Sequence, residues 1–323
     1  MVVANSVFAP IEKDLLSLNQ NLQNMIGARH PVLYAAAEHL FTAGGKRLRP
    51  AIVLLCAQTL AKSSGISAPQ RRLAEITEII HTASLVHDDV LDECSTRRGI
   101  KTVHNVFTTK IAILAGDFLF AQSSWYLANL ENLQVVKVIS KVITDFAEGE
   151  VRQGFTRFDL QFSIEEYIGK SFYKTGSLIA ASCQGAVMLN FADKNIANGF
   201  YMYGRYIGLA FQIIDDILDV VASSNDLGKP AGSDLSQGNL TAPVLFSIPE
   251  DYQITQLINK EFSDIRDIDN ALQIIRQGCG IQQAKDLAAE YLQAAIDCLE
   301  VIDNSKSTES LKKLTLYILE RVN

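Results

Sequence analysis

The sequence predicts an all-α fold, a bundle of helices that forms a single domain over residues 1–323. Three observations predict it: apolar residues recur at steps of three, four or seven, strand-like alternation is nowhere sustained, and glycine (19) and proline (7) are sparse. Side chains three and four residues apart lie on one face of a helix, so these stripes indicate helices that bury an apolar face. With 323 residues, of which 48% are hydrophobic, the chain is long enough for a large core.

The clearest stripe runs over residues 71–93, where Leu73, Ile76 and Ile80 follow one another at helical steps. A second long stripe covers residues 197–222. Further helices are expected, in chain order, over 10–25, 32–42, 50–62, 111–130, 133–154, 164–189, 254–277, 282–302 and 311–322. This pattern gives about ten or more helices joined by turns.

The breaks between these helices are short, at 43–50, 63–69 and 97–102. Pro50 suits the first position of the helix that follows the first break, because that position needs no backbone N–H. One segment is longer, since residues 223–243 are polar and glycine-rich. A loop of about 20 residues inside a compact domain is usually functional or mobile.

Composition argues against several classes of function. The net charge is −7 and no basic run occurs, so nothing indicates nucleic-acid binding. No apolar run reaches the roughly 18 residues that a membrane-spanning helix needs. The first residues lack the basic and apolar regions of a secretory signal, so we expect a cytoplasmic protein. The five cysteines contain no Cys-x-x-Cys pair and are expected to be free, buried thiols: Cys56, Cys94, Cys183, Cys279 and Cys298.

One acidic pattern occurs twice in apolar surroundings, as HDDVLD at 87–92 and as IDDILD at 214–219. Within each copy the first and last aspartates are four residues apart and share a helix face, while the middle one is turned by about 100°. Buried carboxylates repel one another, so a cation is expected between them. If the two helices face each other, the oxygen ligands suit a hard divalent ion, Mg²⁺ in particular. The six carboxylates are Asp88, Asp89, Asp92, Asp215, Asp216 and Asp219.

Two other interpretations of the acidic pattern are open. A single copy could be a solvated helix end, but two copies in apolar context disfavour this. A ferritin-like di-iron bundle needs Glu-x-x-His on two helices. Glu78 and His81 match once, and no other histidine has a glutamate three residues before it.

Basic residues lie near both acidic clusters along the chain. The turn GGKRLRP (44–50) carries Lys46 and Arg49, and its glycines allow a close approach of backbone N–H groups. Arg97 and Arg98 follow the first cluster directly. Singly, such residues are most often surface charges. Together with the carboxylates they indicate a site for diphosphate groups. The remaining cations of this set are Lys170 and Lys174, expected one helical turn apart, and Lys229 in the long loop.

At these residues the chain resembles the trans-type polyprenyl diphosphate synthases. The matching segments are GGKRLRP, LVHDDVLDECSTRRG, FQIIDDILD and GKPAGSDL, in that order, and the resemblance covers nearly the whole chain. The last segment is most similar to long-chain solanesyl (nonaprenyl) synthases. The resemblance implies an isoprenoid-synthase bundle with a central cavity and the two acidic motifs on facing helices. It also implies head-to-tail condensation of isopentenyl diphosphate with an allylic diphosphate, usually by a homodimer.

The resemblance assigns a role to each candidate residue. A Mg²⁺ cluster would be held by Asp88, Asp92, Asp215 and Asp219, with Asp89 and Asp216 in support. Isopentenyl diphosphate would be bound by Lys46, Arg49, His81 and Arg98. The allylic diphosphate would be contacted by Arg97, Lys174, Thr175, Gln212 and Lys229. His81 could instead be the base that removes the proton, although its basic neighbours suit a phosphate donor better.

Two small residues bear on the length of the product. Ala83 and Ser84 lie five and four positions before Asp88, about 6 Å along the helix. A large aromatic residue there would close the cavity at short products, so small ones favour a long chain. Ordinary tight helix packing is the alternative. The rival functions are a farnesyl or geranylgeranyl diphosphate synthase, a terpene cyclase, and a non-catalytic synthase subunit. A long product would also give a loose membrane association.

Overall fold

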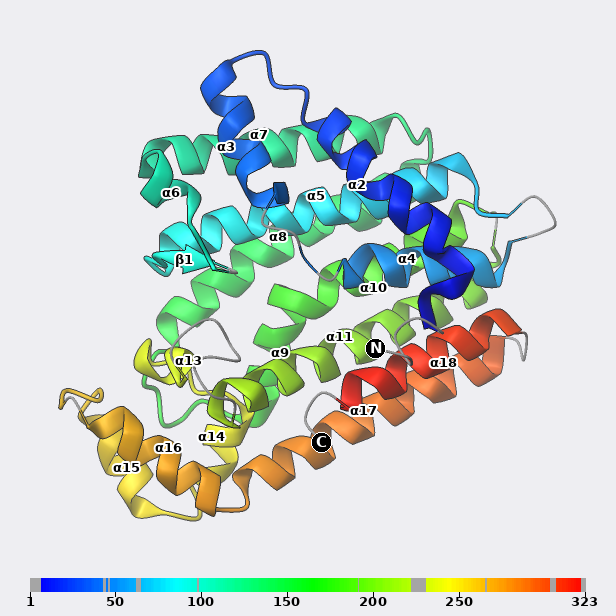
Figure 1. Cartoon of the computed structure of the whole chain (residues 1–323). Helices are drawn as coiled ribbons and strands as arrows, with labels where there is room; N and C mark the ends of the chain where they lie inside the picture. Colours follow the sequence, from blue (N-terminus) through cyan, green and yellow to red (C-terminus); the bar gives the residue numbers. More distant parts are fainter. Residues whose placement is uncertain are drawn as a thin grey trace. The chain divides into compact units, whose positions relative to one another are not determined.

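The computed structural model describes residues 7–42, 45, 47–61, 65–97, 99–190, 192–221, 231–264, 266–302 and 306–320 (Figure 1). The all-α prediction is confirmed, because the structure is 80% helical. Within the described ranges, the strands form one short hairpin, β1 (Thr96–Arg97) with β2 (Ile100–Lys101).

The helices follow one another in the order of the predicted stripes. Up to the hairpin they are η1 (Ala9–Ile11), α2 (Glu12–Ile26), α3 (Pro31–Thr42), α4 (Leu48–Thr59) and α5 (Ala68–Leu91). After it come α6 (Val103–Val106), α7 (Thr109–Ala128), α8 (Leu133–Phe155), α9 (Ile164–Ser171), η2 (Phe172–Gly176), α10 (Ser177–Met188) and α11 (Lys194–Val221). The last are α13 (Ser233–Ser236), α14 (Ala242–Ser247), α15 (Tyr252–Asn259), α16 (Asp267–Gln277), α17 (Gly280–Ile302) and α18 (Lys306–Leu319).

Contacts divide the chain into two compact units, each built from three segments. The first unit comprises Met1–Lys141, Leu178–Tyr201 and Val301–Lys313, and the second comprises Val142–Ser177, Met202–Glu300 and Leu314–Asn323. The first acidic motif belongs to the first unit and the second motif to the second unit. One domain over residues 1–323 stays a prediction.

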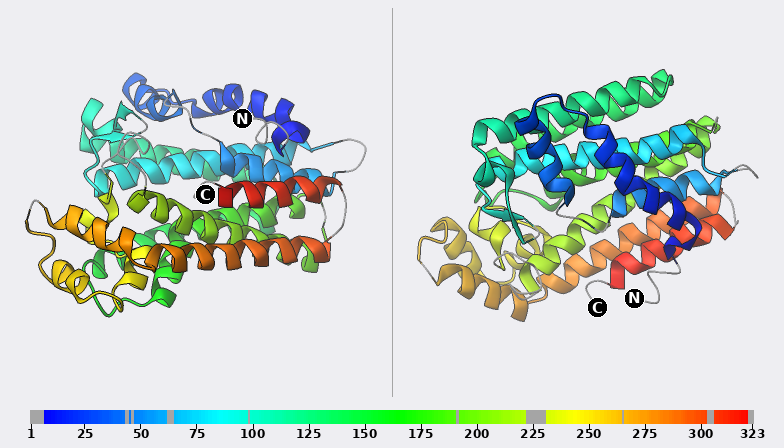
Figure 2. Two further views of the ribbon diagram at one scale, coloured as in Figure 1. Left: turned by 60° about the horizontal axis from the view of Figure 1, so that its bottom comes forward. Right: turned by 45° about the horizontal axis from the view of Figure 1, so that its top comes forward.

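The first unit is organised around α5, which runs alongside α7 and also packs on α4 (Figures 1 and 2). A capping box starts α5, where the Ser67 N–H donates to Gln70 Oε1 at 3.0 Å. The Gln70 amide then donates to the buried Ala186 carbonyl at 2.8 Å. Helix α4 is buried at eight consecutive positions, 50–57, so it lies inside this core rather than on its surface.

In the second unit, α9 continues through η2, and α14 contacts both α9 and α16. Phe158 ties the end of α8 to this group, because its N–H donates to the Gly238 carbonyl at 2.9 Å. Its ring also fills the space that a side chain at Gly238 would need. Gly238 has φ +79°, a conformation that favours glycine.

Several predicted element boundaries were wrong. The helix expected over 164–189 is interrupted by the π-helical turn η2, and the one over 254–277 is two helices, α15 and α16. The hairpin strands, at 96–97 and 100–101, overlap the segment 97–102, and part of the loop expected over 223–243 is the short helix α13. Helix α4 begins at Leu48, so Pro50 is its third residue, where an N–H is still not needed.

Free cysteines are confirmed at all five positions, but only Cys56 and Cys183 are buried. Cys94 and Cys298 are half-buried, and Cys279 is exposed. Among the described residues one helix, α7, has the length and apolar composition that crossing a membrane would require. Core helices pass the same test, so it carries no conclusion alone.

Candidate active site

The first acidic motif lies at the C-terminal end of α5. Asp88 is in the last turn and accepts, through its backbone carbonyl, the N–H of Asp92, the residue that ends the helix, at 2.8 Å. Both side chains are half-buried, whereas Asp89 is only 1% exposed. Asp88 and Asp89 lie on α5 as predicted, whereas Asp92 is the residue at which the helix ends, and the middle aspartate points into the protein.

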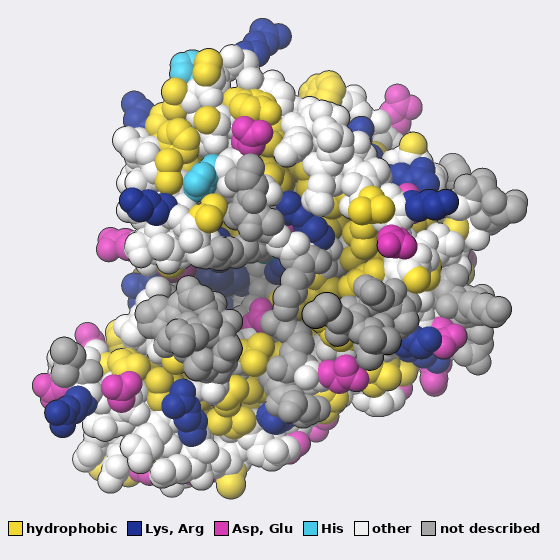
Figure 3. Space-filling view, viewed as in Figure 1, with side chains coloured by type: hydrophobic (Ala, Val, Ile, Leu, Met, Phe, Trp, Pro, Cys, Tyr) yellow, Lys and Arg dark blue, Asp and Glu magenta, His cyan; other side chains and the backbone are white. Residues whose placement is uncertain are grey.

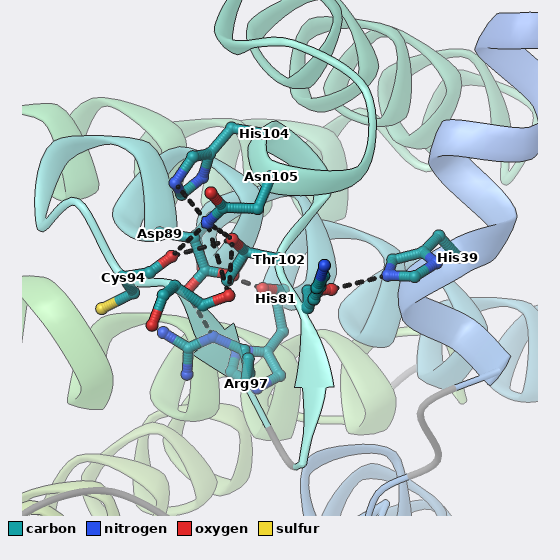
Figure 4. Close-up of polar contacts among 11 residues, drawn as sticks. His39, His81, Asp89, Cys94, Arg97, Thr102, His104 and Asn105 are labelled. Carbon is teal, nitrogen blue, oxygen red and sulfur yellow. Dashed lines mark hydrogen bonds and ion pairs between the residues drawn. The ribbon is translucent and has the colours of Figure 1, made fainter.

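Asp89 is held by Arg97, which reaches it from the hairpin (Figure 4). Arg97 Nε donates to Asp89 Oδ1 at 2.6 Å, whereas Asp89 Oδ2 is buried without a hydrogen-bond partner in the described part of the chain. Burial raises the pKa of the Asp89 carboxyl, and Arg97 opposes that shift. A guanidinium has five N–H donors, so this contact leaves Arg97 able to donate elsewhere.

Side chains at the end of the hairpin fix the position of Arg97 (Figure 4). The Thr102 hydroxyl donates to the Cys94 carbonyl at 2.8 Å, and the Asn105 amide donates to Thr102 Oγ1 at 2.8 Å. His39 Nε2 lies 2.7 Å from the Lys101 carbonyl and must donate to it, because a carbonyl can only accept. The segment that follows the first motif is therefore folded back against the end of α5.

In the second motif the middle aspartate is again buried, but its hydrogen-bond partners are neutral side chains. Asp216 is 3% exposed; the Tyr167 hydroxyl donates to its Oδ2 at 2.6 Å, and Gln212 Nε2 donates to its Oδ1 at 2.7 Å. Gln212 Oε1 in turn accepts from the Thr175 hydroxyl at 2.6 Å. Burial and, to a lesser extent, the charge of Asp234 raise the pKa of Asp216 to about 7. The two hydrogen bonds oppose that shift.

The last aspartate of the second motif is covered by the segment that begins at residue 231. Asp219 is 3% exposed, and its carboxylate accepts from Ser233 Oγ at 3.1 Å and from the Asp234 N–H at 3.3 Å. Gly232, at φ +72°, turns the backbone so that its own N–H reaches the Asp219 carbonyl at 3.0 Å. Asp215 is half-buried, like Asp88.

The turn η2 presents Lys174 and Thr175. Lys174 Nζ lies 2.8 Å from Glu150 Oε1 and donates to Gln153 Oε1 at 3.3 Å. Lys170 was expected one regular helical turn from Lys174. The structure places Lys174 in the π-helical turn, and Lys170 is buried at 8% exposure, with its Nζ 5.2 Å from the centre of the Phe162 ring. Burial, together with the charge of Lys174, lowers the pKa of Lys170, and Asp216 opposes that shift.

Two of the four residues predicted to bind isopentenyl diphosphate lie together, Arg49 on α4 and His81 on α5. Arg49 Nη1 is 3.0 Å from His81 Nε2. A guanidinium can only donate, so Nε2 accepts and the ring proton is on Nδ1 in this arrangement. That contact occupies the nitrogen a base would use, which disfavours His81 as the base. Lys46 and Arg98 of the same predicted group, and Lys229 of the allylic group, lie outside the described residues.

Arg47, between these basic residues, was not predicted to have a role. It has φ +48° at the start of α4 and forms an ion pair with the buried carboxylate of Glu78. Its Nε also donates to Asn19 Oδ1 at 3.2 Å. These contacts attach the basic turn to α5 and α2, so Arg47 acts on the turn's position.

The candidate ligands suit a hard divalent ion whose coordination shell is completed by a substrate. The ligand candidates are carboxylates, and Asp89 offers a buried oxygen without a partner in the described part of the chain. Within the described residues, no three His, Cys, Asp or Glu side chains are close enough to hold an ion by themselves. Mg²⁺ is commonly bound by one or two carboxylates with substrate phosphates and water completing its shell.

A family model described as polyprenyl synthetase matches residues 30–275. The chain belongs to the polyprenyl synthetase family. It is a prenyltransferase enzyme. Members of the polyprenyl synthetase family act on isoprenyl diphosphates and use a divalent metal ion.

Three known proteins show how far the similarity extends. A protein named prenyl transferase from Porphyra purpurea is 61% identical over 323 residues, which is 100% of each chain. Solanesyl diphosphate synthase 1, chloroplastic, from Arabidopsis thaliana is 48% identical over 98% of this chain and 79% of its own. The crystal structure of a Caulobacter crescentus polyprenyl synthase, complexed with calcium and isoprenyl diphosphate, matches with a TM-score of 0.91. That match is 30% identical and covers 98% of this chain and 97% of the other.

Proposed function

We propose that this polyprenyl synthetase condenses isopentenyl diphosphate with an allylic diphosphate, head to tail, into a long all-trans product, solanesyl (C45) diphosphate, for quinone side chains. The observation that carries the long product is the 48% identity to a solanesyl diphosphate synthase over 98% of this chain. Ala83 and Ser84 on α5 are small, so neither would block a tail that passed the first motif. Ala83 is fully buried and Ser84 is half-buried.

The residues divide between two diphosphates. Arg49 and His81, with Lys46 and Arg98, would bind isopentenyl diphosphate; their contact at 3.0 Å supports a shared anion site. The allylic diphosphate would be bound by Arg97, Lys174, Thr175, Gln212 and Lys229. Its ionisation places negative charge on the leaving group, which fixed N–H donors stabilise without reorganising.

Mg²⁺ is the ion that we propose, held by Asp88, Asp92, Asp215 and Asp219, with Asp89 and Asp216 as supports. When bound, such an ion supplies positive charge against the leaving diphosphate. Arg97 and Tyr167 would keep the supporting carboxylates in place, since each holds one at 2.6 Å.

A homodimer is the expected assembly, with α7 at its interface. Figure 3 shows hydrophobic side chains scattered among charged ones on one face of the molecule, which is ordinary for a protein surface. On α7 they are periodic instead: Leu114, Phe118, Ala121 and Trp125 follow at steps of four, three and four. Leu114 is 46% exposed and Trp125 60%, so this stripe is open to a partner.

The deciding experiment is incubation of the purified chain with isopentenyl diphosphate, farnesyl diphosphate and Mg²⁺, followed by sizing of the dephosphorylated products. We expect a ladder that ends at C45. A ladder ending at C20 would identify a geranylgeranyl diphosphate synthase, and consumption of the primer alone would identify a cyclase. Inactivity of the chain without another subunit would indicate a non-catalytic role.

A further inference from the structure

Tyr167 lies beside the second acidic motif but belongs to none of the predicted groups. It is 1% exposed, and α9 directs its hydroxyl to Asp216 Oδ2 at 2.6 Å. From there three hydrogen bonds run in series, Tyr167 to Asp216, Gln212 to Asp216, and Thr175 to Gln212. All four residues belong to the second unit.

Donors and acceptors are arranged in one order along this series. The Tyr167 hydroxyl and the Gln212 NH₂ group both donate to Asp216, one to each carboxylate oxygen. The amide oxygen of Gln212 therefore turns toward Thr175, whose hydroxyl is the donor at 2.6 Å. Donors occupy both oxygens of Asp216, which makes it an anchor for neighbouring groups.

We propose that Tyr167 is a positioning residue for the allylic diphosphate. By holding Asp216 it fixes the amide of Gln212 and, through it, the hydroxyl of Thr175. These are the two neutral groups assigned to that diphosphate, so the inference rests on the proposed function. A phenylalanine would keep the packing of the ring but leave Asp216 Oδ2 buried and unpaired, and the carboxylate could then rotate and release Gln212.

The chain supplies a matched control, Tyr203 on α11. It belongs to the same unit and is 0% exposed, and its phenol lies 3.3 Å from Thr315 Oγ1. Tyr203→Phe therefore removes a buried hydroxyl of the same kind that does not contact Asp216. The melting temperatures of both variants, measured without metal, show how far each substitution destabilises the protein, independent of activity.

The test measures the KM of each substrate separately. We expect Tyr167→Phe to raise the KM for the allylic diphosphate about tenfold, equivalent to about 1.4 kcal/mol. The KM for isopentenyl diphosphate should change less than twofold, and Tyr203→Phe should change neither. If Tyr167→Phe behaves like Tyr203→Phe while the wild type condenses normally, the inference is wrong and the proposed function stands. A wild type without condensation activity overturns both.

A double-mutant cycle with Thr175→Val tests the connection itself. If Tyr167 acts through Gln212 and Thr175, then Tyr167→Phe adds little to the allylic KM once Thr175 lacks its hydroxyl. If the two substitutions multiply each other's effect on the allylic KM, Tyr167 does not act through Gln212 and Thr175. Should Tyr167→Phe not fold, a fluorotyrosine at position 167 keeps the ring and hydroxyl but makes it a stronger donor. An unchanged allylic KM in that variant would also reject the proposal.

Discussion

The middle aspartates of the two motifs have the same spacing and burial but different partners. Asp89 is paired with the cation of Arg97, whereas Asp216 accepts from the neutral groups of Tyr167 and Gln212. The charge of Lys170 also acts on Asp216, but burial and the charge of Asp234 outweigh it and raise the pKa of Asp216 to about 7. The motifs therefore look equivalent in sequence but differ in the groups that hold the middle aspartate.

Ala83 allows a test of product length at a single residue. Because it is fully buried, the ring in Ala83→Phe must take its space either from the prenyl cavity or from packed core. In the first case products should stop at C15–C20, with the first condensation intact and the melting temperature nearly unchanged. The measurement is product sizing together with thermal melting, and Ala83→Ser is the control that keeps the size.

The alternative outcome at Ala83 is equally definite. Overpacking a core usually costs about 1–3 kcal/mol. A lower melting temperature with an unchanged product ladder would show that Ala83 packs between helices and does not line the cavity.

Roles that depend on distant partners could not be predicted residue by residue. Tyr167 is 49 positions from Asp216, and an aromatic residue at helical spacing is usually core. Arg47 stands among cations that suit phosphate, yet its partner Glu78 is 31 positions away. By contrast, Arg49 and His81, which the family resemblance grouped, do lie together, 3.0 Å apart, while their shared role stays a prediction.

At the scale of elements, the spacing of apolar residues predicted where the helices lie. The helix boundaries that were predicted wrongly have local causes. Nothing in Phe172-Tyr173-Lys174-Thr175-Gly176 breaks the helical pattern, so the π-helical turn has no sequence signal. The break between α15 and α16 is made by Glu261 and Phe262 at φ +52° and +50°. Glycine or asparagine would have announced such a turn, whereas these residues do not.

Two glycines around η2 allow a test of that element. A Cβ at Gly176 would lie 3.0 Å from the Phe172 ring, whereas one at Gly169 in α9 meets nothing within 4 Å. Gly169→Ala should therefore stabilise the protein by about 0.5–1 kcal/mol through helix propensity alone. Gly176→Ala should lower the melting temperature and raise the allylic KM, because Phe172 shares the turn with Lys174. Equal effects of the two substitutions would contradict this role of η2.

At the scale of the whole molecule, α7 connects the first motif to a surface. Its inner side is buried at Ala112, Ala115 and Leu119, and it packs on α5. Gly116 leaves room for the ring of His87, whose Nε2 donates to the Ile113 carbonyl at 3.1 Å. His87 directly precedes Asp88, so a change in the position of α7 would be transmitted to the motif.

The outer stripe of α7 then predicts how assembly and activity depend on each other. Leu114→Glu combined with Trp125→Glu should convert a dimer into a monomer, because charges in an apolar interface lose hydration without gaining partners. Condensation should fall at least tenfold through the loosened contact with His87. Light scattering after size exclusion gives the mass, and Leu16→Glu, at a 73% exposed position on α2, is the control. A wild type that is monomeric, or a monomeric variant with full activity, would show that this stripe does not support the site.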